Sequence, residues 1–441
     1  MNVGITAAHY VQPRTVHLKI MKTTTVFFLA TACISQAQTL VNFNGSNGAN
    51  PLGSFIRGTD GNFYGTTYLG GTSSNCNGGG CGIVFEMTPD GSLTVLHSFD
   101  GLDGYQPFGL IQGADGNLYG TTGYGGVSAC GEYCGYGTAF QITPAGAFTT
   151  LHIFAGNDGS QPFSPPTEGK DGNFYGTTFV GGDYGSGTVY KMSPSGTVTS
   201  LYSFCSSGKS CPGGANPSAA LVRARNGKFY GTTNDGGLNG YGTIFEITAD
   251  GEQATLHRFT LSDGSLPAGG LMQATNGLLY GTTVSGGANN YGTIFSITPG
   301  GRLTTMHSFV GTDGSQPQAV LLETSTGELF GAARSGGTQN EGTLFKVSSD
   351  GEVTVLNCFD GAEGANPSSL VQDPASGRIY TTTFSGGSNG YGTIYEWLSL
   401  VSNSAETASA GIESKELTGN PDPKFQTALG GRVTTLPAPG S

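Results

Sequence analysis

Charged residues are scarce in this chain, and their scarcity narrows the range of partners. Lysine, arginine, aspartate and glutamate together make up 11% of the sequence, against roughly 25% in a typical soluble domain. Acidic residues (30) outnumber basic ones (18), which gives a formal net charge of −12 and a pI near 4.8. A nucleic-acid-binding surface needs a basic stripe, and docking on anionic lipid needs clustered lysine or arginine. We therefore expect neither as a partner.

Long apolar runs and helical periodicity are missing as well. After the first 37 residues, no stretch approaches the ~18 consecutive apolar residues that a membrane-spanning helix needs. We therefore expect no transmembrane segment in the mature chain. No segment repeats its apolar residues every 3.6 positions, which excludes helical solenoids.

The first 37 residues have the features of a leader that directs export. Met21-Lys22 precedes an apolar run at 26–32, and a small-x-small cleavage site ends at Ala37. We interpret residues 1–37 as leader and signal peptide, with Met21 as a candidate translation start. Cys33 raises the alternative of a lipoprotein. We expect the mature chain to be secreted, periplasmic or at the cell surface.

Glycine is abundant, with 77 residues, and much of it belongs to a motif that recurs seven times. The motif is an aromatic residue followed by Gly-Thr-Thr or a close variant. Its aromatic residues are Tyr64, Tyr119, Tyr175, Tyr230, Tyr280, Phe330 and Tyr380. Successive copies lie 50 to 56 residues apart, a period typical of β-propellers.

Each repeat contains four short apolar runs separated by hairpin turn signals. In the fifth repeat, the runs cover 270–273, 278–283, 293–297 and 303–309, and Asx-Gly or Gly-Gly turns lie within two of the connections. Neighbouring apolar residues in the third runs imply burial on both sheet faces, as in a blade held between two other blades. The pattern predicts an all-β, seven-bladed β-propeller.

The two ends of the array complement each other. The last repeat stops after its third run, Thr393–Trp397, whereas Leu40–Phe43 aligns with the fourth run Met306–Phe309. Placing this first strand beside the last closes the ring and removes exposed sheet edges. We assign 38–401 to a propeller closed by an N-terminal strand that completes the last blade. We expect 402–441, rich in Ser, Thr, Ala, Gly and Pro, to be a disordered tail.

The recurring elements Tyr-Gly-Thr-Thr, Gly-Gly, Gly-Thr-Ile-Phe and Leu-His-Ser-Phe carry a family resemblance. In this order they resemble the GloVer tandem repeat of exported bacterial proteins, over roughly residues 38–400. The resemblance implies a bacterial exported protein with propeller-like repeats. It implies no established activity, no catalytic residues and no cofactor. The chain departs from the family by lacking a recognisable C-terminal anchor.

Six cysteines form three local pairs in the longest loops of the predicted propeller. The pairs are Cys76 with Cys81, Cys130 with Cys134, and Cys205 with Cys211. In an exported protein such pairs favour disulfides that staple the loops. The alternative, a zinc site, needs four converging ligands, and no histidine accompanies these loops. We therefore expect disulfides and no metal.

The loops that join the second strand of a blade to the third, and each blade to the next, emerge on one face of the ring. We call it the top face. Four tyrosines precede third strands there: Tyr136, Tyr241, Tyr291 and Tyr391. Aromatic faces suit the stacking of sugars, which makes these residues candidate ligand contacts. The alternative is that the four rings pack on neighbouring loops.

A second candidate site is a ring of polar residues at the ends of the first strands, near the bottom mouth of the channel. Its charged members are Arg57, Glu168, Arg223 and Glu323, with Gln112, Gln273 and Gln372 between them. The ring is either a small-molecule or ion site or a solvated rim. The four histidines of the mature chain, His97, His152, His257 and His307, share one repeat position, which favours a structural partner for a neighbouring strand or loop over a catalytic base.

Two classes of function remain. We expect an exported, non-catalytic binding or scaffold propeller, monomeric, that presents its top face to a glycan, a peptide or an envelope protein. The alternative is a polysaccharide-acting enzyme with its site at the channel mouth. Such chemistry needs two carboxylates at fixed separation, and Glu132 and Asp183 are the best candidates because they break the repeat symmetry.

Overall fold

The computed structural model describes residues 37–76, 78–126, 134–206 and 211–397. Within these residues there are strands and turns but no helix, and hence no helix long and apolar enough to cross a membrane. The predicted tail, and the predicted leader apart from Ala37, lie outside the described residues.

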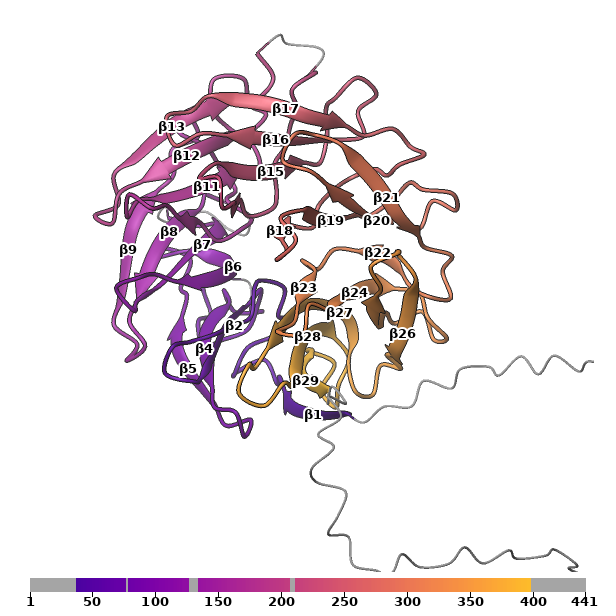
Figure 1. Ribbon diagram of the computed structural model, residues 1–441. Coiled ribbons are helices and arrows are strands. Elements are labelled where there is room, and N and C mark those ends of the chain that lie inside the picture. Colours follow the sequence, from indigo (N-terminus) through magenta and orange to yellow (C-terminus); the bar gives the residue numbers. More distant parts are fainter. Residues whose placement is uncertain (1–36, 77, 127–133, 207–210, 398–441) are drawn as a thin grey trace, which may run out of the picture. The chain divides into compact units, whose positions relative to one another are not determined.

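The strands form seven antiparallel sheets arranged as the blades of a ring (Figure 1). Blade 1 consists of β2 (Ile56–Arg57), β3 (Phe63–Thr67), β4 (Ile83–Met87) and β5 (Leu93–Ser98). Blade 2 consists of β6 (Tyr105–Gln112), β7 (Leu118–Tyr124), β8 (Thr138–Ile142) and β9 (Phe148–Ile153). Blade 3 consists of β10 (Thr167–Glu168), β11 (Phe174–Thr178), β12 (Thr188–Met192) and β13 (Val198–Ser203). Blade 4 consists of β14 (Val222–Arg223), β15 (Phe229–Thr233), β16 (Thr243–Ile247) and β17 (Gln253–Arg258).

The remaining blades repeat this order. Blade 5 consists of β18 (Met272–Gln273), β19 (Leu279–Thr283), β20 (Thr293–Ile297) and β21 (Leu303–Ser308). Blade 6 consists of β22 (Ser315–Pro317), β23 (Leu322–Glu323), β24 (Leu329–Ser335), β25 (Thr343–Val347) and β26 (Val353–Cys358). Blade 7 consists of β27 (Ala365–Gln372), β28 (Ile379–Ser385), β29 (Thr393–Trp397) and β1 (Ala37–Asn42). The predicted seven-bladed propeller is confirmed.

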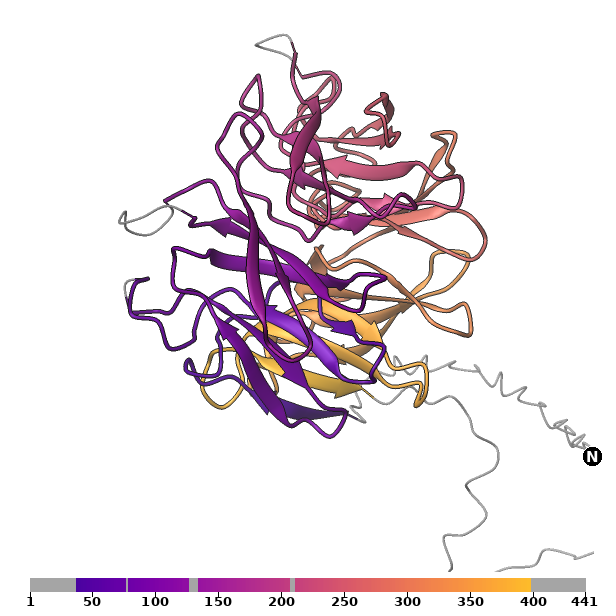
Figure 2. The same cartoon turned by 90° about the vertical axis from the view of Figure 1, so that its left-hand side faces the viewer.

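The ring is closed by the N-terminal strand, as predicted. β1 pairs antiparallel with β29, with Gln38 opposite Glu396 and Asn42 opposite Thr393. In blade 7 the first strand of the propeller therefore takes the outer position that β5 or β21 takes elsewhere. Figure 2, turned to show the side of the ring, places the yellow last blade beside the indigo first one.

Each blade is joined to the next by an aromatic contact near the top face. The phenylalanine that ends each outer-strand motif is buried and packs edge-on against the third-strand aromatic of the next blade, with ring centroids 5.2 to 5.5 Å apart. The seven pairs are Phe43–Phe85, Phe99–Phe140, Phe154–Tyr190, Phe204–Phe245, Phe259–Phe295, Phe309–Phe345 and Phe359–Tyr395. Edge-on packing is a favoured aromatic geometry. The Leu-His-Ser-Phe element thus encodes the blade interface.

The inner strand of blade 5 is shorter than predicted, whereas the inner strands β6 and β27 have eight residues each. In blade 5 the ladder starts only at Met272. The preceding segment contains two glycines and Pro267, which has no N–H to donate, and the N–H of Leu266 bonds to the Tyr241 carbonyl in the preceding blade. In four of the five Tyr-Gly-Thr-Thr motifs, the first threonine donates its hydroxyl to an inner-segment carbonyl of the next blade, and Thr232 is the exception. Thr282, for example, donates to the Pro317 carbonyl oxygen at 3.1 Å. These bonds fix the channel wall from outside.

Candidate functional site

The four top-face tyrosines lie on the predicted face, but they do not come together. Tyr136, Tyr291 and Tyr391 are 48%, 45% and 44% exposed, and Tyr241 is half-buried. The rings of Tyr136 and Tyr291 lie over glycines of the neighbouring crossover loops, so that a Cβ on Gly156 or Gly311 would be 3.2 or 3.4 Å away.

The backbone of each tyrosine also ties one blade to the next. Its carbonyl accepts a hydrogen bond from the residue before the proline of the next inner segment, as in Gln161 N–H to Tyr136 O at 2.8 Å. These contacts are the neighbouring-loop packing that the sequence left as the alternative to ligand binding.

The bottom ring forms hydrogen bonds between blades. Gln112, Glu168, Gln273, Glu323 and Gln372 each accept the N–H of a turn residue in the preceding blade at 2.8 to 3.2 Å. At the seam between blades 7 and 1, Arg57 Nε lies 2.8 Å from Asp373 Oδ1. Arg223 is exposed. We infer that most of the ring stabilises the blade interfaces.

Two of the three predicted disulfides are present. Cys76 is bonded to Cys81 and Cys205 to Cys211, each across a loop of the top face. Cys130 lies outside the described residues, as does Glu132. The other enzymatic candidate, Asp183, is exposed at the start of a loop. Among the described residues, no group of three histidine, cysteine or acidic side chains is placed to hold a metal ion.

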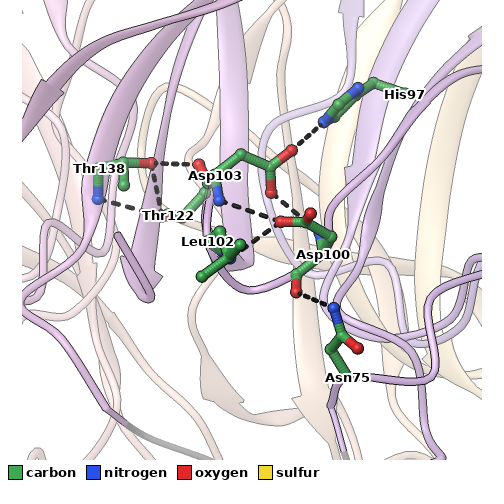
Figure 3. A network of polar contacts seen from close by, with 7 residues as sticks. All are labelled: Asn75, His97, Asp100, Leu102, Asp103, Thr122 and Thr138. Atoms are coloured by element: carbon green, nitrogen blue, oxygen red, sulfur yellow. Dashed lines mark hydrogen bonds and ion pairs between the residues drawn. The ribbon is translucent and has the colours of Figure 1, made fainter. Parts of the chain in front are cut away.

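Each of the four described histidines pairs with the aspartate six residues further on, and Figure 3 shows the first of these pairs. His97 Nε2 lies 2.7 Å from Asp103 Oδ2, while Asp103 Oδ1 accepts the N–H of Asp100 at 2.9 Å. The Asp103 carbonyl accepts the hydroxyl of Thr138, which also contacts the Thr122 hydroxyl (Figure 3). The aspartate thus ties the outer strand to the crossover loop and to the next blade.

The same arrangement recurs at His152, His257 and His307, with ring-to-carboxylate distances of 2.8 to 3.0 Å. Burial disfavours the charged form of Asp263, but hydrogen bonds from His257 and Thr260 outweigh it and hold its pKa below the usual range. The recurrence of this histidine–aspartate pair on the outer strands of four blades supports the structural interpretation of the histidines.

The most distinctive concave surface is the top mouth of the central channel. Its rim is formed by the residue after the proline of each inner segment: Leu52, Phe108, Phe163, Ser218, Ala268, Gln318 and Ser368. Each proline lies against the glycine that precedes the third strand of the previous blade. A Cβ on Gly342, where φ is 107°, would be 2.5 Å from Pro367 Cδ. The close approach requires glycine and fixes the rim.

One half of this mouth is aromatic. The Phe108 and Phe163 rings lie 4.8 Å apart, Phe163 contacts Phe179 at 5.4 Å, and Tyr68 contacts Phe108 at 5.7 Å. Tyr68 continues the band to Phe384, 6.4 Å away. Blades 3, 2, 1 and 7 therefore supply a continuous apolar surface.

The other half is polar and carries one cation. Ser218 donates to Asn234 Oδ1 at 2.9 Å, and Arg334 donates to Gln318 Oε1 at 3.3 Å. The Arg334 guanidinium lies 5.2 Å from the ring centroid of Phe384, where the two halves meet. The mouth can therefore hold a ligand that has one apolar face and one polar edge.

Below the rim, the channel opens into a cavity of about 190 Å³. The deeper wall is formed by small or apolar residues, among them Ser54, Pro165, Ala220, Gly270, Val320 and Ser369. Of the residues that the structure describes, no aspartate, glutamate or histidine lines the rim or this wall.

This site was missed from the sequence. Our interpretation followed residues that recur, whereas the rim consists of residues that differ at one repeat position. The signal was available: the position after Asn-Pro, Gln-Pro or Leu-Pro holds phenylalanine in two repeats and serine, alanine, glutamine or leucine in the others. Such a break in symmetry beside an invariant proline indicates where one side of a ring differs from the other.

Comparison with known proteins identifies the repeat and the fold. A family model described as Gloeobacter/Verrucomicrobia repeat matches residues 19–213, 127–325 and 300–421. No curated protein matches the chain. Virginiamycin B lyase from Staphylococcus aureus is similar in structure, with a TM-score of 0.55 and 14% identity over 82% of this chain and 99% of that one.

The extracellular domain of the putative hybrid two-component system BT4673 from B. thetaiotaomicron is also similar in structure. Its TM-score is 0.55 at 11% identity, over 82% of this chain and 39% of that one. At these identities, the two likenesses show the propeller fold alone.

Proposed function

We propose, from the premise that this chain belongs to the Gloeobacter/Verrucomicrobia repeat family, that it is an exported, non-catalytic binding protein whose ligand enters the top mouth of the channel. The resemblance found in the sequence is to this family, and it brings no activity with it. Export is supported by the leader sequence and by the two loop disulfides, because such bonds persist in oxidising compartments.

The observation that carries the proposal is the two-sided mouth. A carbohydrate has an apolar C–H face and a polar hydroxyl edge, and the aromatic band opposite Ser218, Gln318 and Arg334 complements both. The rim residues are held by strands and by close proline–glycine contacts, and a rigid wall lowers the entropy lost on binding. We therefore propose a glycan as the ligand, and a peptide or an envelope protein as the outcomes to be tested against it.

Binding is favoured over hydrolysis because of the chemistry of the wall. Glycoside hydrolysis needs an acid and a base or nucleophile, both normally carboxyl groups. The described residues that line the top mouth and the wall below it supply neither. The Staphylococcus aureus protein of similar fold is named a lyase, an activity that is that protein's own. Because a similar fold carries an enzyme there, the test of this proposal includes a turnover assay.

The test is a glycan and envelope-extract screen on the full chain, followed by two matched variants. Phe163→Ala removes an aromatic side chain from the rim, whereas Tyr291→Ala removes one from the top face outside it. We expect the first change to weaken binding at least tenfold and the second to leave it within twofold. The opposite pattern would move the site to the loop tyrosines. Release of reducing sugar would establish an enzyme instead.

A further inference from the structure

Arg334 is the one charged side chain among the described residues of the channel rim. It is half-buried at the end of β24 (Leu329–Ser335), in the repeat that departs most from the motif, with Phe330-Gly331-Ala332-Ala333 in place of Tyr-Gly-Thr-Thr. The equivalent residues of the other repeats are Tyr68, Gly123, Phe179, Asn234, Val284 and Phe384. A cation therefore occurs at this position in a single blade.

Among the described residues, the Arg334 guanidinium has no counter-ion. Its partners are the Gln318 amide oxygen at 3.3 Å and the ring of Phe384 at 5.2 Å. No carboxylate within the described residues lies at ion-pair distance from it, a property that it shares with Arg223, Arg225, Arg258 and Arg302. Arginine stays protonated at any physiological pH and offers five N–H donors in a planar fork. Most of that fork is available to a ligand.

The backbone holds this fork in place. β24 extends through Arg334 to Ser335 and pairs with β22 on its inner side, with Ser315 opposite Ser335. The Arg334 carbonyl accepts the Asn366 amide at 2.9 Å. The residues before and after Arg334 both pair with β22, so the backbone that carries this cation is held in place. Such a cation is a positioned binding group and not a solvated surface residue.

We infer, resting on the proposed function, that the glycan bound at the channel mouth is a sugar acid whose carboxylate is held by Arg334. The planar guanidinium matches a carboxylate through two parallel hydrogen bonds. The aromatic band then faces the C–H side of the ring, and Gln318 and Ser218 face its hydroxyls. The net negative charge of the chain is no obstacle, because exposed charges beyond about 8 Å are largely screened at physiological ionic strength.

The test compares each sugar acid with its own neutral form. Isothermal titration calorimetry on the full chain measures binding of trisaccharides of gluco-, manno- and galacturonate and of their methyl esters, together with neutral and sulfated trisaccharides. We expect one acid to bind at least tenfold more tightly than its ester. We expect Arg334→Gln to abolish that difference, and Arg334→Lys to restore only part of it because lysine lacks the fork.

The outcomes separate this inference from the function on which it rests. Equal affinity for acid and ester, preference for the sulfated sugar, or an unchanged Arg334→Gln variant would each overturn the sugar-acid assignment while leaving a glycan site in place. No binding of any sugar would overturn the proposed function itself. Circular dichroism and thermal unfolding of Arg334→Gln, expected to match the unmodified chain, show that the variant is folded.

Discussion

Closure of the ring makes the first and last blades depend on Phe43, which can be tested against an equivalent residue in the middle of the chain. Phe43 and Phe309 are both fully buried, and their rings lie 5.5 and 5.3 Å from Phe85 and Phe345 at interplanar angles of 63° and 62°. Replacing a buried phenylalanine by alanine lowers the free energy of unfolding by about 3–5 kcal/mol. Both variants should lose about 4 kcal/mol in urea unfolding.

The two variants should differ in how they open. β21, which precedes Phe309, is joined by a hairpin turn to its partner β20, whereas β1, which precedes Phe43, is held to its partner β29 by pairing alone and not by a connecting turn. Phe43→Ala should therefore let β1 detach before the rest of the ring unfolds. Amide hydrogen exchange should show lost protection in 393–397 for Phe43→Ala but not for Phe309→Ala. Equal protection of this strand in both variants, or a loss below about 1 kcal/mol for Phe43→Ala, would refute the closure argument.

Three further predictions concern the pKa of a tyrosine, a loop disulfide and a hydrogen bond between blades. Burial of Tyr119, together with its hydrogen bond to Asp115, raises its pKa to about 12. Because unfolding restores a pKa near 10, the stability that this group contributes should be fully present below pH 10 and decline between pH 10 and 12, as measured by urea unfolding with Tyr119→Phe as the control. Removing the Cys205–Cys211 bond by double substitution to serine should lower the free energy of unfolding by about 2 kcal/mol at most, since it closes a short loop. Alkylation of Cys205 and Cys211 in the unfolded protein without prior reduction would show that the bond is absent. Glu323→Ala should lower the free energy of unfolding by about 1 kcal/mol by removing the charge-assisted hydrogen bonds that the carboxylate accepts from Thr275, and Glu323→Gln should restore most of it, because glutamine holds this position in other blades.

The architecture could be predicted because it depends on residues that recur. Ile244 and Phe245 indicated burial on both sheet faces, and both are fully buried. The strand Leu40–Phe43 indicated closure because it matched an outer strand with no blade of its own. Each of these inferences needed only one repeat to be compared with another.

The candidate site could not be predicted in the same way, because it depends on how neighbouring blades meet. Phe108 and Phe163 lie one repeat apart in the sequence, yet their rings are in contact along the channel rim. The bottom ring presented the opposite difficulty. Glu323 looked available for a ligand, yet its carboxylate accepts the N–H of Thr275 in the preceding blade. A polar residue at a blade edge is within reach of two blades, and a single repeat shows only one of them.

The aromatic contacts between blades have a consequence for how a gene of this kind can change in length. Every repeat supplies a phenylalanine to its successor and receives one from its predecessor, and the seven contacts are alike within 0.3 Å (5.2 to 5.5 Å). Duplication or loss of one whole repeat therefore leaves every donor with an acceptor, and β1 pairs with whichever third strand comes last. The interfaces tolerate a change of copy number, but the channel mouth does not: a duplicated fifth repeat would insert a second alanine beside Ala268 and move Arg334 one blade further from Ser218.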